Sequence, residues 1–489
     1  MERSRGIKNN NNNSSRGIEE NIMAILDASG VKEARDVDDD RLAFLEAVRA
    51  AFLVVEAGSP PPRKISEAIF EILRDGTSLE LTMASFQLLT ELDKHYPNMN
   101  LSNSDTSELT GGRGSESLAD KETWSPFALG PESAHSEREA TSKNSADPID
   151  SSGFSFLIQN IAQAPEEMKC LKYVKKSLVD MLLFKYLVNV LERDFFHRNI
   201  IHKETRNWFL LRESLLSMLL GSRRVSYKNL VKDCLSIISR CSHQTDVGLH
   251  SIPSLERSSD RVVHDVEVAP AVALVELQKE TCVAVQNLFV LNMELDKAKK
   301  LAETQGCTSR ADGVRTPVIE IIVDELAYNE DLLFPFLQAF SESRWKIEII
   351  LQYFWKYLPK PSVRTRRSRN TSEDETFNAV LRSFSSDSSV RSIIKKISAE
   401  TAQLLLAHSF QHEVALQEEV LKIKKFFKDI KLRRHIEMCL NRDLNMDDEF
   451  VLFLPHIHLS ILISATFILL GTFRSQITPV ALCHFFHPA

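Results

Sequence analysis

The clearest hydrophobic pattern of the chain lies between residues 316 and 358, where two segments each carry an apolar stripe at helical spacing. Thr316 and Pro317 suit an N-cap and a first helical position, and Ser343 can cap the second segment. Pro359 ends that segment, because proline has no backbone N–H to donate and restricts the residue before it. The pattern predicts two amphipathic helices that pack on each other through their stripes, which are Ile319, Ile322, Val323 and Leu326 in the first and Ile347, Ile350, Leu351, Phe354 and Leu358 in the second.

Apolar residues recur at helical spacing along most of the chain, separated by short and medium loops. Glycine is scarce, with 15 residues, and runs of alternating β-branched residues are few, which favours an all-α fold. No fixed period joins the helices, so we predict an irregular armadillo-like or HEAT-like helical array rather than a strict repeat. Further helices are predicted at residues 18–26, 38–52, 65–73, 79–95, 166–196, 203–221, 225–243, 270–304, 377–384 and 398–411.

Shifts in composition divide the chain into seven segments. The predicted segments are a disordered tail with an asparagine run (1–37), an N-terminal helical bundle (38–97), a disordered linker rich in serine and acidic residues (98–153), the main helical array (154–358), a basic loop (359–375), terminal helices (376–411) and a divergent tail (412–489). Within that tail, residues 413–441 form a predicted basic amphipathic helix, and residues 450–470 are nearly free of charge.

One apolar island, Trp124 to Phe127, interrupts the linker. Aromatic residues in a polar setting are often binding contacts, so the island could anchor a partner. The alternative is that it folds back onto its own domain, because exposed aromatic rings seek the nearest apolar groove. We favour the second interpretation.

Composition restricts the class of protein. Hydrophobic residues make up 43% of the chain, which is typical of a globular protein. The net charge of −7 argues against a surface that coats nucleic acid as a whole, so a nucleic-acid contact would have to be a local patch. Seven scattered cysteines suit a reducing compartment, and the polar N-terminus predicts no secretory signal.

Arg310, Asp312, Gly313 and Arg315 precede the first helix of the central pair and could form an anion pocket at its N-terminus. A phosphate site would also need a glycine-rich loop with a companion lysine, which is missing here. We therefore favour a structural role, in which the two arginines pair with carboxylates such as those of Glu320 or Asp324.

Metal, cofactor and catalytic sites are not predicted. Cys234, Cys241 and His243 lack a fourth ligand at short spacing, and His456 and His458 are a bare pair in an apolar run. No serine lies in a nucleophile-elbow pattern, no cysteine–histidine arrangement stands out, and the carboxylates fall mostly on solvent faces. The sequence thus predicts a protein that is not an enzyme and needs no cofactor.

Two charged clusters are candidates for binding. Glu320, Asp324 and Glu325 fall away from the apolar stripe of their helix and are candidates for a partner surface. A concentrated basic cluster follows the second helix and resembles a nuclear-import signal, with a solvated loop as the alternative. Its residues are Lys360, Arg364, Arg366, Arg367 and Arg369.

Several long runs resemble a known family. TSRADGVRTP, EIIVDEL, WKIEIILQY and YLPKPSVRTRR, together with DRLAFLEAVRAA, LELTMASFQLLTEL and LVELQKE upstream, are similar to the plant family of negative regulators of systemic acquired resistance. The resemblance spans residues 37–411. It implies a nuclear protein that represses defence-gene transcription and acts in DNA repair and recombination. It further implies an accessory role in the structural-maintenance-of-chromosomes (SMC) five/six complex, beside a second non-SMC subunit.

Two other classes remain open. A directly DNA-binding repressor would need a recognition helix, which the sequence does not show, so DNA contact is expected to be indirect or weak. A membrane-anchored protein would use residues 450–470, which are about long enough to cross a bilayer. Pro455, His456 and His458 within that run weaken the membrane interpretation.

Overall fold

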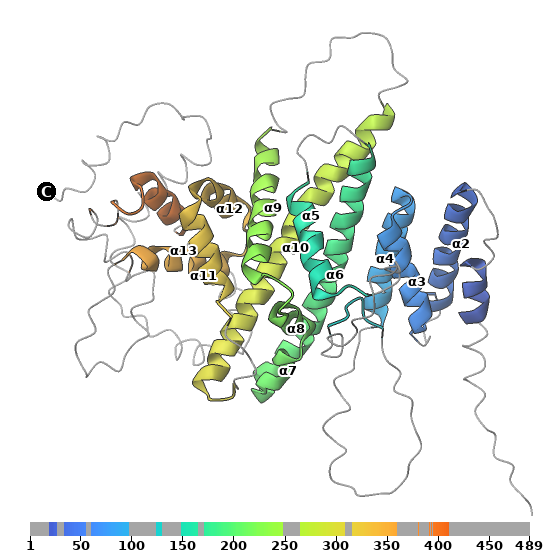
Figure 1. The fold of residues 1–489 in the computed structure, drawn as a ribbon, viewed down its shortest axis with the longest axis horizontal. Coiled ribbons are helices and arrows are strands. Elements are labelled where there is room, and N and C mark those ends of the chain that lie inside the picture. The colour runs from blue at the N-terminus through green and yellow to red at the C-terminus, as the bar shows by residue number, and fades with distance from the viewer. Residues whose placement is uncertain are drawn as a thin grey trace, which may run out of the picture. The chain divides into compact units, whose positions relative to one another are not determined.

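The computed structural model of the chain is mostly helical in the residues it describes, with an isolated β-bridge and no strand among them (Figure 1). The chain divides into two compact units, Met1–Glu325 and Leu326–Ala489. The described residues are 19–26, 34–54, 60–96, 124–129, 148–164, 171–247, 265–308, 315–358, 380, 391, 393 and 395–409. The predicted all-α class is confirmed, whereas the armadillo-like or HEAT-like arrangement remains a prediction.

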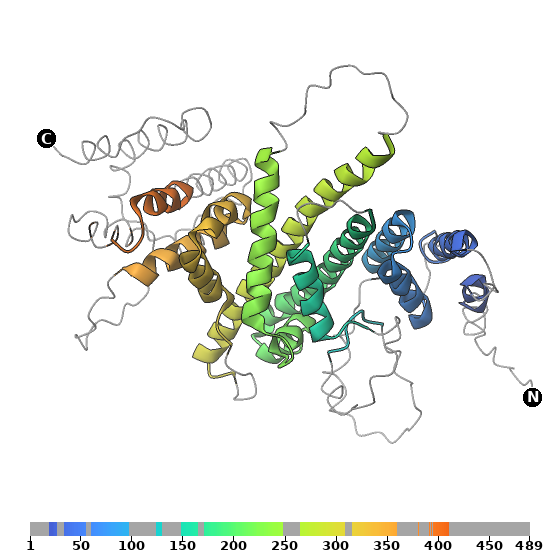
Figure 2. The ribbon, with the colours of Figure 1, turned by 45° about the horizontal axis from the view of Figure 1, so that its top comes forward.

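The first unit stacks its helices side by side. Its elements are a helix at residues 19–26, α2 (Ala34–Phe52), α3 (Arg63–Asp75), α4 (Leu79–His95), α5 (Ser151–Ala162), α6 (Leu171–Thr205), α7 (Trp208–Arg212), α8 (Leu215–Gly221), α9 (Tyr227–Val247) and α10 (Asp265–Thr304). Helix α6 contacts both α4 and α10, α10 also contacts α9, and α5 contacts α6 and α9 (Figures 1 and 2). The two longest helices, α6 and α10, therefore form the centre of this unit.

Helices α3 and α4 lie where the apolar period predicts them, and local chemistry fixes their ends. Gly76 ends α3 in the left-handed conformation, with φ of 54°. Ser78 starts α4, because its hydroxyl oxygen accepts a hydrogen bond from the backbone N–H of Leu81 at 3.1 Å. A Cβ at Gly76 would lie 2.4 Å from a methyl carbon of Val179 on α6, so the turn also needs glycine for close packing.

The aromatic island folds back onto the first unit. The ring of Trp124 meets Phe70 of α3 edge-on at 5.5 Å between centroids. Phe127 is buried, forms the β-bridge with Ile149, and lies 6.0 Å from the ring of Phe154 on α5. The prediction that the island folds back onto its own domain is thus confirmed for Trp124 and Phe127.

The predicted single helix at residues 203–221 is wrong, because the chain there forms the end of α6 and two short helices. Arg206 has a positive φ of 56°, which breaks the α-helical backbone. Asn207 and Ser214 then act as N-caps, accepting bonds from the backbone N–H groups of Phe209 and Ser217. The apolar period continues through these breaks, so periodicity alone could not reveal them.

The ends of the other long helices differ modestly from the prediction. Helix α6 continues to Thr205, and α10 begins at Asp265, ahead of the expected start at Pro270. Helix α5 begins inside the predicted linker, where the Asp150 carboxylate accepts a bond from the backbone N–H of Gly153 at 2.7 Å. The apolar side chains of α10 that are buried include Leu277, Val285, Leu288, Leu291 and Leu295.

The second unit contains η3 (Glu330–Leu332), α12 (Leu333–Ala339), α13 (Ser343–Tyr357) and a helix at residues 399–409, while α11 (Val318–Tyr328) spans the boundary between the units. Phe336 and Phe340 stack at 5.1 Å, and Ile350 and Phe354 are fully buried. Ser343 is the first residue of α13 rather than its cap, which is Glu342. The predicted packing of the α11 stripe on the α13 stripe remains a prediction.

Several expectations fall outside the described residues. They are residues 1–18 and 27–33 of the asparagine-rich tail, the basic loop, most of the 98–153 linker, all of residues 412–489, and the helix at 377–384 apart from Val380, which is helical and buried. The predicted tail ends earlier than residue 37, because residues 34–37 belong to α2. Within the part of the chain that the structure describes, no helix is long and apolar enough to cross a membrane.

Candidate partner surface on helix α11

Helix α11 is held at its N-terminus by a carboxylate from α10. Asp296 accepts a hydrogen bond from the backbone N–H of Val318, the first helical residue, at 2.7 Å. Negative charge at this position satisfies an otherwise unpaired N–H group and complements the helix dipole. Asp296 therefore takes the capping role that the sequence assigns to Thr316.

The same carboxylate forms an ion pair with Arg315. The Arg315 guanidinium lies over the ring of Tyr227 on α9, 4.5 Å from the ring centroid. Burial raises the pKa of Tyr227, and the charge of Arg315 partly offsets that rise. Arg315 thus joins the start of α11 to both α9 and α10.

This geometry supports the structural interpretation of Arg315 but corrects its partner. We expected Glu320 or Asp324, one or two turns further along the same helix, whereas the ion pair is with Asp296. Arg310, Asp312 and Gly313 lie outside the described residues, so the anion-pocket alternative is not tested there.

The three acidic candidates of α11 do not share one face. Glu320 and Asp324 are exposed and lie one turn apart, so they form a common acidic face. Glu325 is only 9% exposed, and its carboxylate pairs with Lys232 at 3.1 Å and Lys228 at 3.6 Å, both on α9. The outward assignment of Glu325 is wrong, because one residue further along a helix turns its side chain by about 100°.

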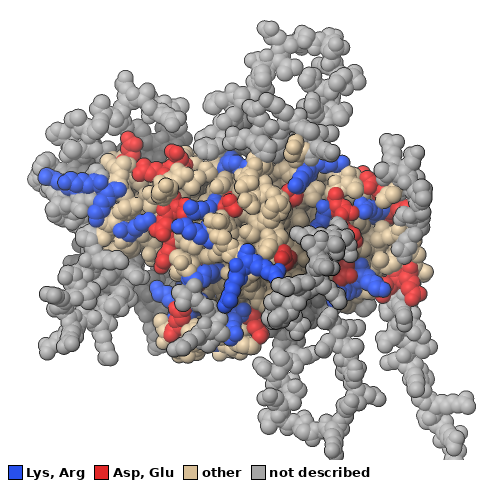
Figure 3. Space-filling view, in the orientation of Figure 1, with Lys and Arg blue, Asp and Glu red and all other residues tan. Residues whose placement is uncertain are grey.

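Charges of both signs surround these residues. Lys228 and Lys232 keep side-chain exposures of 59% and 45% while they pair with Glu325. On the visible face of the molecule, acidic and basic side chains alternate over the described residues (Figure 3). A mixed surface of this kind suits a protein partner better than a phosphate backbone, which needs a continuous basic track.

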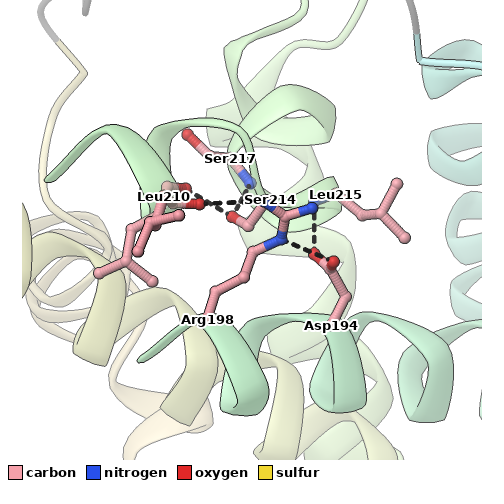
Figure 4. Close-up of polar contacts among 7 residues, drawn as sticks. Asp194, Arg198, Leu210, Ser214, Leu215 and Ser217 are labelled. Carbon is pink, nitrogen blue, oxygen red and sulfur yellow. Dashed lines mark hydrogen bonds and ion pairs between the residues drawn. The ribbon is translucent and has the colours of Figure 1, made fainter. Parts of the chain in front are cut away.

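A second carboxylate repeats the arrangement of Asp296 within the same unit. Asp194 on α6 accepts from the backbone N–H of Leu215, the first residue of α8, and from Nε of Arg198, both at 2.8 Å (Figure 4). Arg198 also donates to the carbonyl oxygen of Leu210 at 3.3 Å. The sequence analysis predicted neither the capping site at Asp194 nor the one at Asp296. The i, i+4 spacing of Asp194 and Arg198 is visible in the sequence, but the contact with Leu215 is not.

A third ion pair, between Asp93 of α4 and Arg193 of α6, joins the N-terminal helices to the centre of the unit. Tyr186 lies beside this pair. Burial raises the pKa of the Asp93 carboxyl, and the charge of Arg193 opposes that rise. This pair therefore links α4 to α6, as the pair of Asp296 and Arg315 links α10 to the start of α11.

Cys234 and Cys241 of α9 belong to no metal-ligand cluster among the side chains that the structure describes. Cys234 is fully buried, and burial raises the pKa of its thiol, which is typical of an inert residue. Cys241 lies against α10 instead. Among the described residues, no group of three or more histidine, cysteine or acidic side chains could hold a metal ion. The side chain of His243 and all of His456 and His458 lie outside them.

The nuclear-import candidate, Lys360 to Arg369, also lies outside the described residues. Its function remains a prediction, as do the roles of Glu320 and Asp324 as partner contacts.

Comparison with known proteins places these features in a family. The family model described as the SNI1 middle domain matches residues 98–342, and the SNI1 C-terminal domain model matches residues 358–442. The second match extends to residue 442, beyond the range of 37–411 over which the sequence runs resemble the family. Residues 443–489, which include the apolar segment, lie beyond both models.

A relative from Arabidopsis thaliana is named negative regulator of systemic acquired resistance SNI1. It is 42% identical over 410 residues, which cover 82% of this chain and 85% of the relative. No solved structure matches the chain. Identity at this level over most of both sequences shows that the chain belongs to the SNI1 family.

Proposed function

We propose that the protein is a negative regulator of systemic acquired resistance in plants, acting as a nuclear scaffold without catalysis. The observation that carries this proposal is the 42% identity with the Arabidopsis regulator over 82% of the chain. The protein represses defence-gene transcription until resistance is induced.

The described fold supports a scaffold. Ion pairs and caps between distant residues, such as Asp296 with Val318 and Asp93 with Arg193, hold the long helices of the first unit in fixed positions. A rigid stack of helices offers extended surfaces to protein partners. The exposed face of Glu320 and Asp324 is the surface that we assign to one such partner, with basic side chains opposite it.

We further propose that the partners are subunits of the SMC five/six complex, together with a second non-SMC subunit, and that the protein acts through this complex in DNA repair and recombination. Contact with DNA is then indirect or weak, because the complex supplies the DNA-binding surface. The mixed charge of the visible face is consistent with a protein that binds other subunits and leaves DNA binding to them (Figure 3).

Complementation tests the regulatory role. Arabidopsis plants that lack their own family member are expected to show raised defence-gene transcripts, and expression of this chain should return the transcripts to the wild-type level. A destabilised variant, Phe289→Ala in the core of α10, is the matched control and should fail. The proposal is overturned if the wild-type chain accumulates in the nucleus and the transcripts stay high.

Affinity purification from plant nuclei, followed by mass spectrometry, tests the partners. SMC five/six subunits should co-purify with the wild-type chain. A variant with Glu320→Lys and Asp324→Lys should lose one partner selectively, whereas Glu303→Lys at another exposed position should lose none. Equal recovery of every partner in all three samples would remove the acidic face of α11 from the proposal.

Neutralising the basic cluster tests nuclear entry. Replacing Arg364, Arg366, Arg367 and Arg369 together with glutamine should reduce nuclear fluorescence of a tagged chain, because import receptors recognise clustered basic side chains. The control replaces Arg223 and Arg224, an exposed basic pair elsewhere in the chain. Unchanged nuclear accumulation in the first variant would assign the cluster to a solvated loop.

A further inference from the structure

Two cysteine thiols from different helices meet between α9 and α10. The thiol of Cys241 on α9 donates to the backbone carbonyl oxygen of Gln278 on α10 at 3.4 Å. Gln278 lies one turn before Cys282, and helical side chains lean toward the N-terminus, over the preceding turn. The thiol of Cys282 therefore lies beside that of Cys241, close enough for the two groups to influence each other's ionisation.

The surroundings of the pair favour a thiolate on Cys282. The amide nitrogen of Gln286 lies 3.5 Å from the Cys282 sulfur and can donate to it. The contact with Cys241 lowers the pKa of Cys282 to about 7, although burial opposes the change. The same contact raises the pKa of Cys241, so Cys282 is the first of the two thiols to lose its proton.

The other described cysteines lack these features. Cys234 is fully buried, with a raised pKa, on the same helix as Cys241. Cys307 is exposed at the end of α10, and its thiol contacts the backbone oxygen of Gln305 at 3.8 Å. Within the part of the chain that the structure describes, Cys241 and Cys282 are thus set apart by their mutual contact.

We propose that Cys241 and Cys282 form a redox modification site, which a peroxide converts into a disulfide that joins α9 to α10. The Cys282 thiolate attacks one oxygen of hydrogen peroxide, so an S–O bond forms, the O–O bond breaks, and hydroxide leaves and takes up a proton as water. Cys241 then gives up its proton as its sulfur attacks the sulfenic sulfur, an S–S bond forms, and the second oxygen leaves with that proton as water. Together, the two thiols lose two protons and two electrons, and one peroxide becomes two waters.

Burial decides the class of oxidant. Cys282 is 6% exposed and Cys241 is half-buried, so a protein thiol or disulfide cannot reach the pair easily. A small uncharged peroxide is the oxidant that suits this position, and Cys241 is the more exposed of the two thiols. The same burial protects the sulfenic acid of Cys282 from further oxidation, because the thiol of Cys241 is closer to it than a second peroxide molecule.

The disulfide would change how the two helices are tied together. Residues 242–281 separate the two cysteines along the chain, so the crosslink closes a long loop. A crosslink of this kind stabilises a fold mainly by restricting the unfolded chain. Oxidation should therefore make α9 harder to detach from α10, and reduction should reverse the change.

The test uses the purified full chain, reduced and then treated with hydrogen peroxide, and maps its peptides without reduction. Trypsin places Cys241 in peptide 241–257, Cys282 in 280–297 and Cys234 in 233–240. We expect peptides 241–257 and 280–297 to be joined, with a mass two hydrogens below their sum, and dithiothreitol to separate them. The melting temperature of the oxidised chain should exceed that of the reduced chain.

Matched variants isolate the pair. Cys234→Ser should still form the crosslink and show the same rise in melting temperature, whereas Cys282→Ser should lose both. Circular dichroism shows whether each variant keeps its helices, and Cys241→Ser provides a second test if Cys282→Ser unfolds. The proposal is overturned if peroxide leaves the two peptides unlinked in the wild-type chain, or if Cys282 stops at the sulfinic acid. A crosslink that forms preferentially to Cys307 overturns it as well.

Discussion

The carboxylate of Asp296 lies 2.7 Å from the backbone nitrogen of Val318, so a residue in the last third of α10 determines where α11 begins. The pairing of this carboxylate with Arg315 adds a partly buried ion pair, whose side chains are 14% and 18% exposed. Removal of the carboxylate would leave both an N–H group and a guanidinium without their partner.

We therefore expect Asp296→Ala to lower the free energy of unfolding by about 2–4 kcal/mol. Asp296→Asn keeps an acceptor for the Val318 N–H and loses the charge, so its cost should be intermediate. Urea denaturation of the full chain, followed by circular dichroism, measures both variants. Glu320→Ala, an exposed position on α11, is the control and should stay within about 0.5 kcal/mol. Equal stability of all three would show that the Asp296 contact is energetically unimportant.

The acidic residues of α11 should separate into two classes. Glu325→Lys places a third cation beside Lys228 and Lys232, and we expect it to cost about 1–3 kcal/mol. Glu320→Lys and Asp324→Lys should each change stability by less than about 0.5 kcal/mol, because both positions are exposed. Phe354→Ala, in a fully buried position of α13, gives the scale of a core defect at roughly 3–5 kcal/mol. A tolerated Glu325→Lys would contradict the burial of this carboxylate against α9.

Gly76→Ala should destabilise the first unit by about 1–3 kcal/mol. The residue has a φ of +54°, and its new methyl group would lie 2.4 Å from a methyl carbon of Val179. Gly221→Ala is the matched control, because no atom lies within 4 Å of the added carbon at the end of α8. The melting temperature should fall only for Gly76→Ala. Equal melting temperatures for the two variants would mean that the added methyl group does not meet Val179 and that the turn has another conformation.

Lys346 should make stability depend on pH in the alkaline range. Its side chain is 5% exposed and donates to the carbonyl oxygen of Leu337 at 2.7 Å, and burial lowers its pKa from 10.5 to about 8. Below pH 8 the ammonium is charged in both states, so the folded chain carries the full cost of its burial. Between about pH 8 and 10.5 the folded chain loses the proton first, and stability rises with pH.

The comparison with Lys346→Met isolates this effect from other groups. The free energy of unfolding of the wild type, minus that of Lys346→Met, should rise by about 3 kcal/mol across this range, since each pH unit between the two pKa values is worth about 1.4 kcal/mol. The difference should be flat below pH 8. Lys356→Met, an exposed position of α13, should show no such rise. A difference that is constant from pH 7 to 11 would refute the lowered pKa.

Periodicity predicted the helices well because burial of one face leaves a local signal. Helix α4 begins and ends at the predicted residues, and Ile322, Val323 and Leu326 are buried as their stripe requires. The same signal failed between residues 203 and 221, where Asn207 and Ser214 interrupt a continuous apolar pattern with caps. Short capping residues occur in helices and loops alike, so their effect depends on the surrounding packing.

The candidate site was less predictable, because its contacts join residues that are distant in sequence. Glu325 follows the exposed Asp324, and only the position of α9 decides that it is buried. The partner of Arg315 lies 19 residues upstream, and that of Cys241 lies on another helix. Spacing along the chain carries no information about such pairs until the stack of helices is known.

The capping contacts of Asp194 and Asp296 have a consequence for how this architecture tolerates change. Each fixes the first residue of a later helix from a distance, 21 positions upstream for Leu215 and 22 for Val318. The length of the connecting segment then does not determine where the later helix begins, because the capping carboxylate does. Insertions or deletions between Cys307 and Thr316 should shift the path of the connection while leaving α11 in place. The helices can thus keep their alignment while the segments that join them vary in length.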